Sequence, residues 1–270
     1  MESPKVMGVV NVTPDSFSDG GLFRDPALAV EHGRKLVAEG ADVLDVGGES
    51  TRPGSEGVSV ADELDRVRPV LEGLSEVAAE ISIDTTKRAV AEAALDRGAS
   101  IVNDVSALRS DPELAALCAE RKCGVVLMHM LGSPRTMQDD PRYDDVVDEV
   151  KAFLAERIEY AMAAGVAEQR IWVDPGIGFG KTLEHNLELL CRLGEIRSLG
   201  RPVCVGTSRK SFIGKITGRD AHERLGGTIA SNVLALANGA EVFRVHDVRE
   251  VREALAVAEV LLGRRKWVRA

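Results

Sequence analysis

The 270-residue sequence predicts a (β/α)8 barrel that occupies residues 1–270 as a single domain. Short apolar runs recur eight times, and most of them are separated by stretches with helical periodicity. A polar or charged residue follows each run. The composition shows no break along the chain that would mark a second domain.

The eight apolar runs are the predicted strands. They lie at 6–10, 43–46, 81–83, 101–102, 125–128, 171–173, 203–205 and 242–245. Runs that are apolar throughout indicate strands buried on both faces, as in a parallel sheet covered by helices. Eight of them in a chain of this length favour a closed barrel. The competing fold is a doubly wound open sheet, whose glycine-rich turn should follow the first strand, where this chain has Asn11-Val12-Thr13-Pro14 instead.

Several helix boundaries can be predicted from their end residues. Asp25-Pro26 precedes a helical pattern over 27–39, and Asp111-Pro112 precedes another over 113–120. Gly40, Gly98 and Gly239 each stand before an alanine and a strand, where glycine can end a helix in the left-handed conformation. Two alanine- and leucine-rich helices are expected over 223–237 and 248–262.

Composition and charge exclude several classes of protein. The net charge of −9 disfavours binding to nucleic acid or to anionic membranes. No apolar run approaches the roughly 20 residues that cross a bilayer, and the first residues lack the layout of a signal peptide, so we expect a cytoplasmic protein. The four cysteines form no Cys-x-x-Cys pair and are expected to be small buried core residues. They are Cys118, Cys123, Cys191 and Cys204.

Polar residues follow all eight predicted strands, at the end of a barrel where catalytic residues gather. They are Asn11, Asp45 with residues 49–52, Asp84, Asn103-Asp104, His129, Asp174, residues 208–211 and residues 244–247. Helix caps or turns explain one or two such positions, but not all eight.

The chemistry of these residues falls into three groups. Asp84, Asn103 and Asp174 suit a heterocycle that carries amide and amidine nitrogens. A second, basic group suits phosphate or carboxylate, and it consists of Arg52, Arg209, Lys210, Arg244 and His246. Asn11 offers an oxygen ligand for Mg²⁺ that is held mainly through substrate phosphates.

Two glycine-rich segments need separate interpretation. Residues 174–182 end in Gly180-Lys181-Thr182, like a nucleotide-binding P-loop, but Pro175 stands where that motif requires glycine. What remains is a glycine loop displaying Phe179, either a plain connection or a wall for a flat substrate. Residues 15–21 carry Phe17 and Asp19 and are expected to form a lid, with an ordinary turn as the alternative.

Taken together, these segments resemble the dihydropteroate synthase family over nearly the whole chain. The similar segments are 7–21, Asp45-Val46-Gly47-Gly48-Glu49-Ser50-Thr51-Arg52-Pro53-Gly54, Ser82-Ile83-Asp84-Thr85, Asn103-Asp104-Val105-Ser106, 174–181, Ser208-Arg209-Lys210-Ser211-Phe212 and 244–248. Each is weakly specific alone. In this order, one after the other along the barrel, they are highly specific.

The resemblance implies a reaction and a set of roles. Members of the family join p-aminobenzoate to a hydroxymethyl-dihydropterin diphosphate with Mg²⁺ and release pyrophosphate. The implied pterin-binding residues are Asp84, Asn103, Asp174 and Lys210. The implied diphosphate and metal residues are Asn11, Arg244 and His246, assisted by Asp19 and Arg52. The implied p-aminobenzoate residues are Phe17, Thr51, Pro53, Phe179 and Ser211.

The implied mechanism is dissociative: diphosphate leaves first, and the arylamine attacks the resulting cation. Asp84, Asp174, Lys210, Arg244 and His246 would then be the catalytic residues. Arg244→Ala is expected to slow turnover while free pterin binding stays near normal. The resemblance also implies sulfonamide inhibition and a homodimer formed through helices near the end of the barrel.

Three alternatives stay open at this point. A pterin-dependent methyltransferase shares the barrel and the pterin-edge residues, but has no use for a diphosphate clamp at 244–246. A catalytically inactive pterin-binding protein should have lost loop residues such as Thr51 and Arg52. A general sugar-phosphate barrel is disfavoured by the acidic edge.

Overall fold

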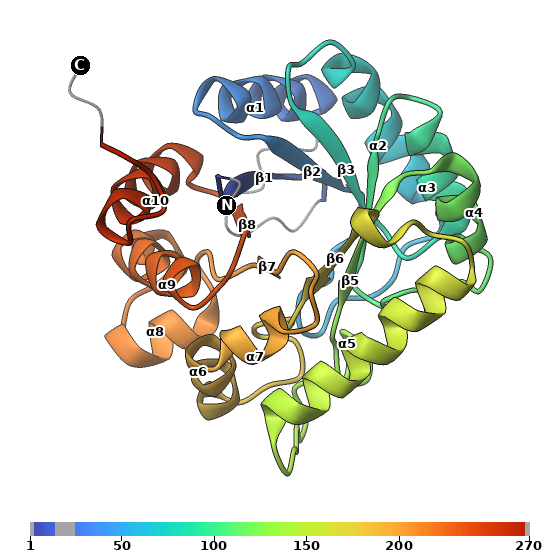
Figure 1. Cartoon of the computed structure of the whole chain (residues 1–270). Coiled ribbons are helices and arrows are strands. Elements are labelled where there is room, and N and C mark those ends of the chain that lie inside the picture. The colour runs from blue at the N-terminus through green and yellow to red at the C-terminus, as the bar shows by residue number, and fades with distance from the viewer. Residues whose placement is uncertain (1–2, 14–24, 268–270) are drawn as a thin grey trace.

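The computed structural model describes residues 3–13 and 25–267. Eight strands form a ring, and helices surround it (Figure 1). The strands are β1 Lys5–Asn11, β2 Val43–Gly47, β3 Glu80–Asp84, β4 Ile101–Asp104, β5 Gly124–Met128, β6 Ile171–Asp174, β7 Cys204–Val205 and β8 Val242–Val245. All eight predicted strands are confirmed.

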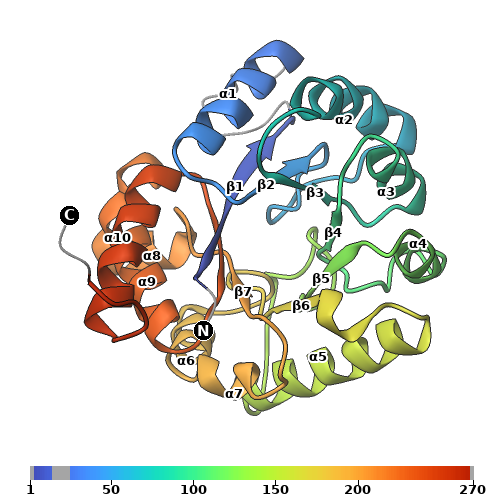
Figure 2. The same cartoon turned by 45° about the horizontal axis from the view of Figure 1, so that its top comes forward.

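The helices alternate with the strands and cover the outside of the ring (Figure 2). They are α1 Pro26–Ala38, α2 Val60–Leu74, α3 Arg88–Leu95, α4 Leu114–Arg121, α5 Val146–Ala163, α6 Leu183–Cys191, α7 Leu193–Arg197, α8 Ser211–Thr217, α9 Leu225–Ala237 and α10 Val248–Leu261, with 3-10 turns at Glu168–Arg170 and Ala221–Glu223. The predicted helices at 27–39, 113–120, 223–237 and 248–262 are present within two residues at each end.

The strands are parallel and their order closes the barrel. The order is β6-β5-β4-β3-β2-β1-β8-β7, and every pairing between them is parallel. The ring closes between β6 and β7 through a parallel bridge from Val173 to Val203. The (β/α)8 barrel is thereby confirmed over the doubly wound open sheet, which would leave two free edges.

Alternation along the strands separates two apolar regions. Outward residues pack with the helices in one large cluster that includes Leu44, Ile83 and Phe243. Inward residues form a small plug inside the barrel, made of Met7, Val43, Ile101, Val126, Cys204 and Val242 with Trp172 against it. Because side chains alternate with a period of two, the next inward position on each strand lies one layer above this plug.

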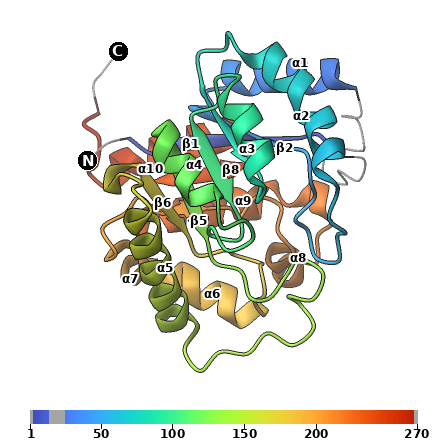
Figure 3. The same ribbon diagram turned by 90° about the vertical axis from the view of Figure 1, so that its right-hand side faces the viewer.

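Gly40, Gly98 and Gly239 lie between a helix and the following strand with φ of 101°, 93° and 109°. The predicted left-handed glycine at these helix ends is therefore confirmed. In Figure 3, the start of β1 and the segment after α10 lie on one side of the barrel and the loop between β2 and α2 on the other.

The prediction that all four cysteines are buried is wrong for Cys191. Cys118, Cys123 and Cys204 are buried, but Cys191 is exposed at the end of α6. Leu189 and Leu193 occupy the buried positions there, and residue 191 lies about 200° around the helix from Leu189. None of the helices in the described ranges is both long and apolar enough to span a membrane.

Candidate active site

A cavity of about 400 Å³ opens above the apolar plug, at the carboxyl ends of the strands. It is lined by every predicted site residue that the structure describes. These are Asn11, Thr51, Arg52, Pro53, Asp84, Asn103, Asp174, Phe179, Lys210, Ser211, Arg244 and His246. The other two predicted residues, Phe17 and Asp19, lie outside the described residues, as does the predicted lid at 15–21.

The floor of the cavity is a set of inward polar side chains. Asp45, Asn103 and Arg244 each stand two residues after a residue of the plug on the same strand. Asp174 stands two residues after Trp172, which packs against the plug. Strand register places Asp84 beside Asn103. The period of the strands therefore brings residues far apart in the sequence into one layer.

Arg244 links two buried carboxylates. Its Nε donates to Asp45 Oδ2 at 2.7 Å, and its Nη2 donates to Asp84 Oδ2 at 2.9 Å. Asn103 Nδ2 also donates to Asp45 Oδ2, at 3.0 Å. Asp45 is fully buried, and sequence analysis noted it without giving it a role. Its position in the structure shows that it orients both Arg244 and Asn103.

Each of these two carboxylates keeps one oxygen without a partner. Asp84 Oδ1 and Asp45 Oδ1 are buried and accept no hydrogen bond from the described residues. Burial raises the pKa of Asp84, Asp45 raises it further, and Arg244 lowers it. Burial lowers the pKa of Arg244, but both carboxylates together raise it above its ordinary value. Because a buried, unpaired acceptor is costly, Asp84 Oδ1 is suited to a ligand N–H.

Asp174 and Lys210 both contact the backbone of the glycine loop at 175–180. Asp174 Oδ1 accepts the Gly176 N–H at 2.7 Å, while Lys210 Nζ donates to the Ile177 carbonyl. Lys210 Nζ also lies 4.3 Å from the centroid of the Phe179 ring. Burial lowers the pKa of Lys210 to about 8, with Asp174 acting in the opposite direction. Lys210 can therefore hold a proton or release one near neutral pH.

The loop after β7 is held in an uncommon backbone conformation. Arg209 has φ of 57°, in the left-handed region, and its Nε donates to Asp247 Oδ2 at 3.0 Å. Thr228 Oγ1 accepts the Arg209 N–H at 3.0 Å. Strained backbone conformations persist only where surrounding contacts hold them, and they are common at functional sites. Here it places Lys210 and Ser211, the first residue of α8, at the cavity.

His246 lies at the end of β8 and is uncharged. Its Nδ1 lies 3.0 Å from Ser208 Oγ, and its backbone N–H donates to the same oxygen at 3.2 Å. Burial, together with the nearby Arg244, Arg209 and Arg52, lowers the pKa of His246 to about 3. His246 therefore offers a hydrogen bond to a ligand instead of a positive charge.

The loop after β2 is anchored to α2 and α3. Lys87 Nζ donates to Glu49 and to the fully buried Glu63, and Arg66 Nη1 donates to the Gly48 carbonyl at 2.8 Å. A Cβ at Gly48 would lie 2.8 Å from Val67 Cγ1, so only glycine allows this close approach. These contacts fix the base of the segment that carries Thr51, Arg52 and Pro53.

A second cavity of about 560 Å³ lies on the other side of this loop. It shares Glu49, Ser50, Thr51, Asp84 and Val105 with the first cavity. The remaining lining comes from the β2 loop itself and from the loops after β3, β4 and β5.

Two polar residues that sequence analysis placed on the rim lie elsewhere. Asp104 is fully buried and accepts the N–H groups of Ser106 and Leu108, both at 2.7 Å, so it shapes the loop after β4. His129 does not line either cavity, and its Nδ1 lies 2.9 Å from Lys181 Nζ beneath the glycine loop. The prediction that His129 lies on the cavity rim is therefore wrong, because the residue packs against Lys181 instead.

The cavity offers few protein ligands for Mg²⁺. Among residues 3–13 and 25–267, no three His, Cys, Asp or Glu side chains are grouped as a metal site. The amide of Asn11 lines the cavity beside Arg244 and His246. One hard oxygen donor beside a set of cations fits an ion that keeps its waters and binds mainly through substrate phosphates.

Comparison with known proteins identifies the family. A family model described as "pterin binding enzyme" matches residues 7–246. The dihydropteroate synthase of Escherichia coli (strain K12) is 46% identical over 264 residues, which are 97% of this chain and 93% of that protein. The chain belongs to the dihydropteroate synthase family. It is a transferase, and its activity is dihydropteroate synthesis.

Solved structures of this family share the fold and the ligand chemistry. A Yersinia pestis dihydropteroate synthase in a sulfonamide drug complex has a TM-score of 0.94 and 42% identity, covering 97% of this chain and 95% of that chain. A Xanthomonas albilineans dihydropteroate synthase with 4-aminobenzoic acid has a TM-score of 0.90 and 48% identity, covering 96% and 93%. Identity at this level over nearly the whole chain supports a shared activity as well as a shared fold.

Proposed function

We propose that the enzyme joins p-aminobenzoate to hydroxymethyl-dihydropterin diphosphate by a dissociative route. One observation carries the proposal: a single cavity combines an acidic, amide-bearing floor with a cationic rim. The floor suits a pterin ring and the rim suits a diphosphate. The 4-aminobenzoic acid in the Xanthomonas albilineans relative supports the second substrate.

The pterin ring binds on the polar floor. Asp84 Oδ1 lacks a partner and accepts an N–H from the guanidine-like edge of the ring. Asn103 matches a mixed donor and acceptor edge, and Asp174 faces the ring from β6. Arg244 keeps Asp84 in place through the hydrogen bond of 2.9 Å.

The first chemical step breaks the C–O bond between the pterin methylene and the diphosphate. The electron pair leaves with the diphosphate, and the cation that forms is delocalised into the pterin. Asp174 stabilises this cation, while Arg52, Arg244 and His246 stabilise the departing charge, His246 as a neutral hydrogen-bond partner.

In the second step the arylamine nitrogen of p-aminobenzoate forms the C–N bond with its lone pair. The nitrogen then releases one proton to solvent or to pyrophosphate. The walls of this site are Phe179 and Pro53, and Thr51 and Ser211 receive the carboxylate. None of these roles requires a covalent enzyme intermediate.

We further propose that Mg²⁺ is bound with the diphosphate, with Asn11 as its protein ligand. The ion would neutralise charge on the leaving group. Asn11 lies next to the cationic rim, where the diphosphate binds. The enzyme would therefore require both Mg²⁺ and this amide for full turnover.

The decisive experiment measures pyrophosphate release from purified protein with the pterin diphosphate, Mg²⁺ and p-aminobenzoate. Release that depends on p-aminobenzoate, with an equal amount of dihydropteroate, supports the proposal. Sulfonamides should compete with p-aminobenzoate in the same assay. Pterin binding without release contradicts it, and methyl transfer from a methylated folate would then be measured for the methyltransferase alternative.

We also propose a cytoplasmic homodimer that forms through α9 and α10. Several large apolar side chains are exposed on and just after these two helices. They are Leu234, Val257, Leu261, Leu262 and Trp267, with exposed fractions of 45–81%. The two helices pack against each other, and a second copy would cover their exposed apolar surface.

A further inference from the structure

The glycine loop at 175–180 is held by its carbonyl groups. Four consecutive carbonyl oxygens each accept a hydrogen bond from a different side chain. Ile177 O accepts from Lys210, Gly178 O from Gln138 Nε2 at 2.7 Å, Phe179 O from Lys181 Nζ at 3.0 Å, and Gly180 O from Tyr143 Oη at 2.8 Å. Side chains thus replace the backbone hydrogen bonds that a helix or strand would supply.

The loop also lies in close contact with the segment after β5. Gly176 has φ of 67°, and a Cβ there would lie 1.9 Å from the His129 carbonyl oxygen. Gly180 has φ of 65°, and a Cβ there would lie 2.6 Å from Leu131 Cβ. These close contacts restrict the backbone conformation of the loop. Ile177 and Phe179 carry its two large side chains.

Lys181 occupies an unusual place in this arrangement. It is 3% exposed, and its Nζ contacts the His129 Nδ1 at 2.9 Å and the Phe179 carbonyl at 3.0 Å. Within the described part of the chain, Lys181 forms no ion pair with a carboxylate. Burial lowers the pKa of Lys181 to about 7, and Asp174 opposes this effect. Burying a lysine side chain costs free energy, so we expect Lys181 to have a role that offsets this cost.

The position of Phe179 matters for the cavity that it lines. Its ring packs against a cluster of Val105, Met128, Met130 and Met137. Lys210 lies over the ring, as described above. A shift of the Phe179 backbone would move the ring away from both the methionines and Lys210.

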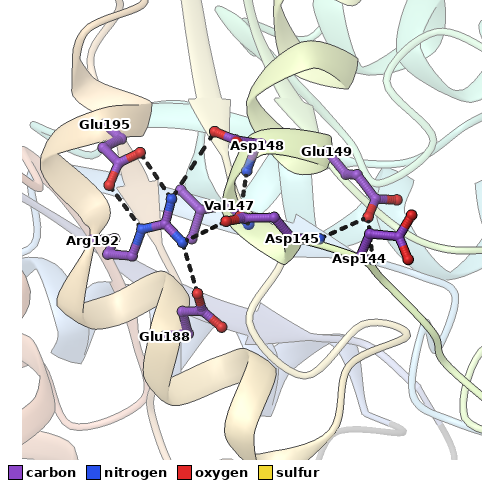
Figure 4. A network of polar contacts seen from close by, with 8 residues as sticks. All are labelled: Asp144, Asp145, Val147, Asp148, Glu149, Glu188, Arg192 and Glu195. Atoms are coloured by element: carbon purple, nitrogen blue, oxygen red, sulfur yellow. Dashed lines mark hydrogen bonds and ion pairs between the residues drawn. The ribbon is translucent and has the colours of Figure 1, made fainter.

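The segment that holds the loop is itself fixed at its far end. Residues 129–145 supply His129, Gln138 and Tyr143, and they end at Asp145, the N-cap of α5. Arg192, between α6 and α7, pairs with Asp145 at 2.9 Å, Glu188 at 2.7 Å and Glu195 at 2.8 Å (Figure 4). This network joins the start of α5 to α6 and α7, so the donors Gln138 and Tyr143 have a fixed support.

We propose that Lys181 is a positioning residue for p-aminobenzoate: it holds the Phe179 carbonyl against His129 and thereby fixes the ring that forms one wall of the site. The inference rests on the function proposed above. Lys181 touches neither substrate, so its effect passes through Phe179. Tyr143 acts in the same way on the next carbonyl, at Gly180.

The test compares three variants by steady-state kinetics. Lys181→Met keeps the length of the side chain and removes the donor, Tyr143→Phe removes one hydroxyl, and Lys35→Met removes an exposed lysine of α1 as a control. In Lys181→Met, the KM for p-aminobenzoate should rise about tenfold, while kcat and the KM for the pterin diphosphate change less than about threefold. Tyr143→Phe should shift the same constant less, and Lys35→Met should shift none.

Equal changes in both KM values, or none, would overturn the inference. A crystal structure of Lys181→Met provides a measurement that does not depend on turnover. A displaced Phe179 ring supports the inference, and a ring in its original place overturns it. A wild-type protein without pyrophosphate release would instead contradict the proposed function. If Lys181→Met does not fold, the same two measurements on Tyr143→Phe decide the matter.

Discussion

At the level of single residues, the site depends on how buried charges are paired. Asp45 and Asp84 share Arg244, so this arginine compensates two buried carboxylates at the floor of the cavity in addition to its proposed role toward the diphosphate. Sequence analysis assigned Arg244 to the diphosphate alone. The structure adds that Arg244 also holds Asp84, the carboxylate proposed to bind the pterin.

Arg244→Ala should therefore impair both turnover and pterin binding. Loss of charge stabilisation should lower kcat by about 10²–10³. Pterin binding should weaken too, because Asp84 and Asp45 lose their cation and the pKa of Asp84 rises further. This differs from the sequence-based expectation of near-normal pterin binding. Calorimetric titration with a pterin measures the second effect, and unchanged affinity would show that Asp84 does not depend on Arg244.

The buried Lys181 should make stability depend on pH. Its pKa is about 7 in the folded protein and 10.5 ordinarily, so between these values the unfolded chain binds a proton that the folded protein does not. Stability contributed by this residue therefore rises with pH across that window. The groups facing Lys181 are His129, Asp174 and Lys210.

The expected effect is a difference between two proteins. From pH 8 to pH 10, the free energy of unfolding of wild type minus that of Lys181→Met should increase by roughly 1.4 kcal/mol per pH unit. Urea denaturation at several pH values measures it, and the subtraction removes titrations common to both proteins. A difference that stays constant with pH would contradict the lowered pKa.

At the level of elements, loops after the strands owe their shape to contacts with neighbouring loops. The glycine loop after β6 illustrates this, because its carbonyls are bound by side chains from the segment after β5, from Lys181 and from the β7 loop. Three of its residues are glycines with positive φ. The flexibility suggested by so many glycines is absent once these contacts form.

Gly176→Ala should consequently be far more damaging than an ordinary glycine replacement. The new Cβ would overlap the His129 carbonyl, so we expect a loss of roughly 3 kcal/mol or more in unfolding free energy. Gly200→Ala is the matched control, since Gly200 has φ of 73° but no atom within 4 Å of its Cβ position. It should cost about 1–2 kcal/mol. Equal losses in urea denaturation would contradict the close contact.

At the level of the whole molecule, the cavity is separate from the surface proposed for the dimer. The cavity lies at the carboxyl ends of the strands, while the five exposed apolar side chains of the proposed interface lie on or just after the outer helices α9 and α10. In Figure 1, α6, α7 and α8 lie between these helices and α5. A dimer formed there leaves the outer surface of α5 open.

Replacing Leu234 and Leu261 together by glutamate should convert the proposed dimer into a monomer. Two charges on each copy would be buried without partners in the interface. Light scattering after size-exclusion chromatography measures the mass. Met162→Glu on α5, at a side chain 43% exposed, is the control and should leave the mass unchanged. A monomeric wild type would contradict the proposed dimer.

The sequence by itself determined the fold and most of the site. Eight apolar runs predicted the strands, and the polar residues that follow them predicted the lining of the rim. The polar residues after the strands therefore lie together, and twelve of the predicted residues line one cavity. Local pattern is sufficient here because the barrel brings equivalent strand ends to the same rim.

Only the tertiary structure decided how these residues are paired. Asp45 with Arg244, Lys87 with Glu63, and Lys181 with His129 are contacts between distant segments, and no local pattern encodes them. Lys181 was set aside with a motif that failed, while Asp104 and His129 were placed on the rim although they support loops behind it. Sequence period fixes the face on which a side chain lies, whereas its partner depends on packing between neighbouring strands and loops.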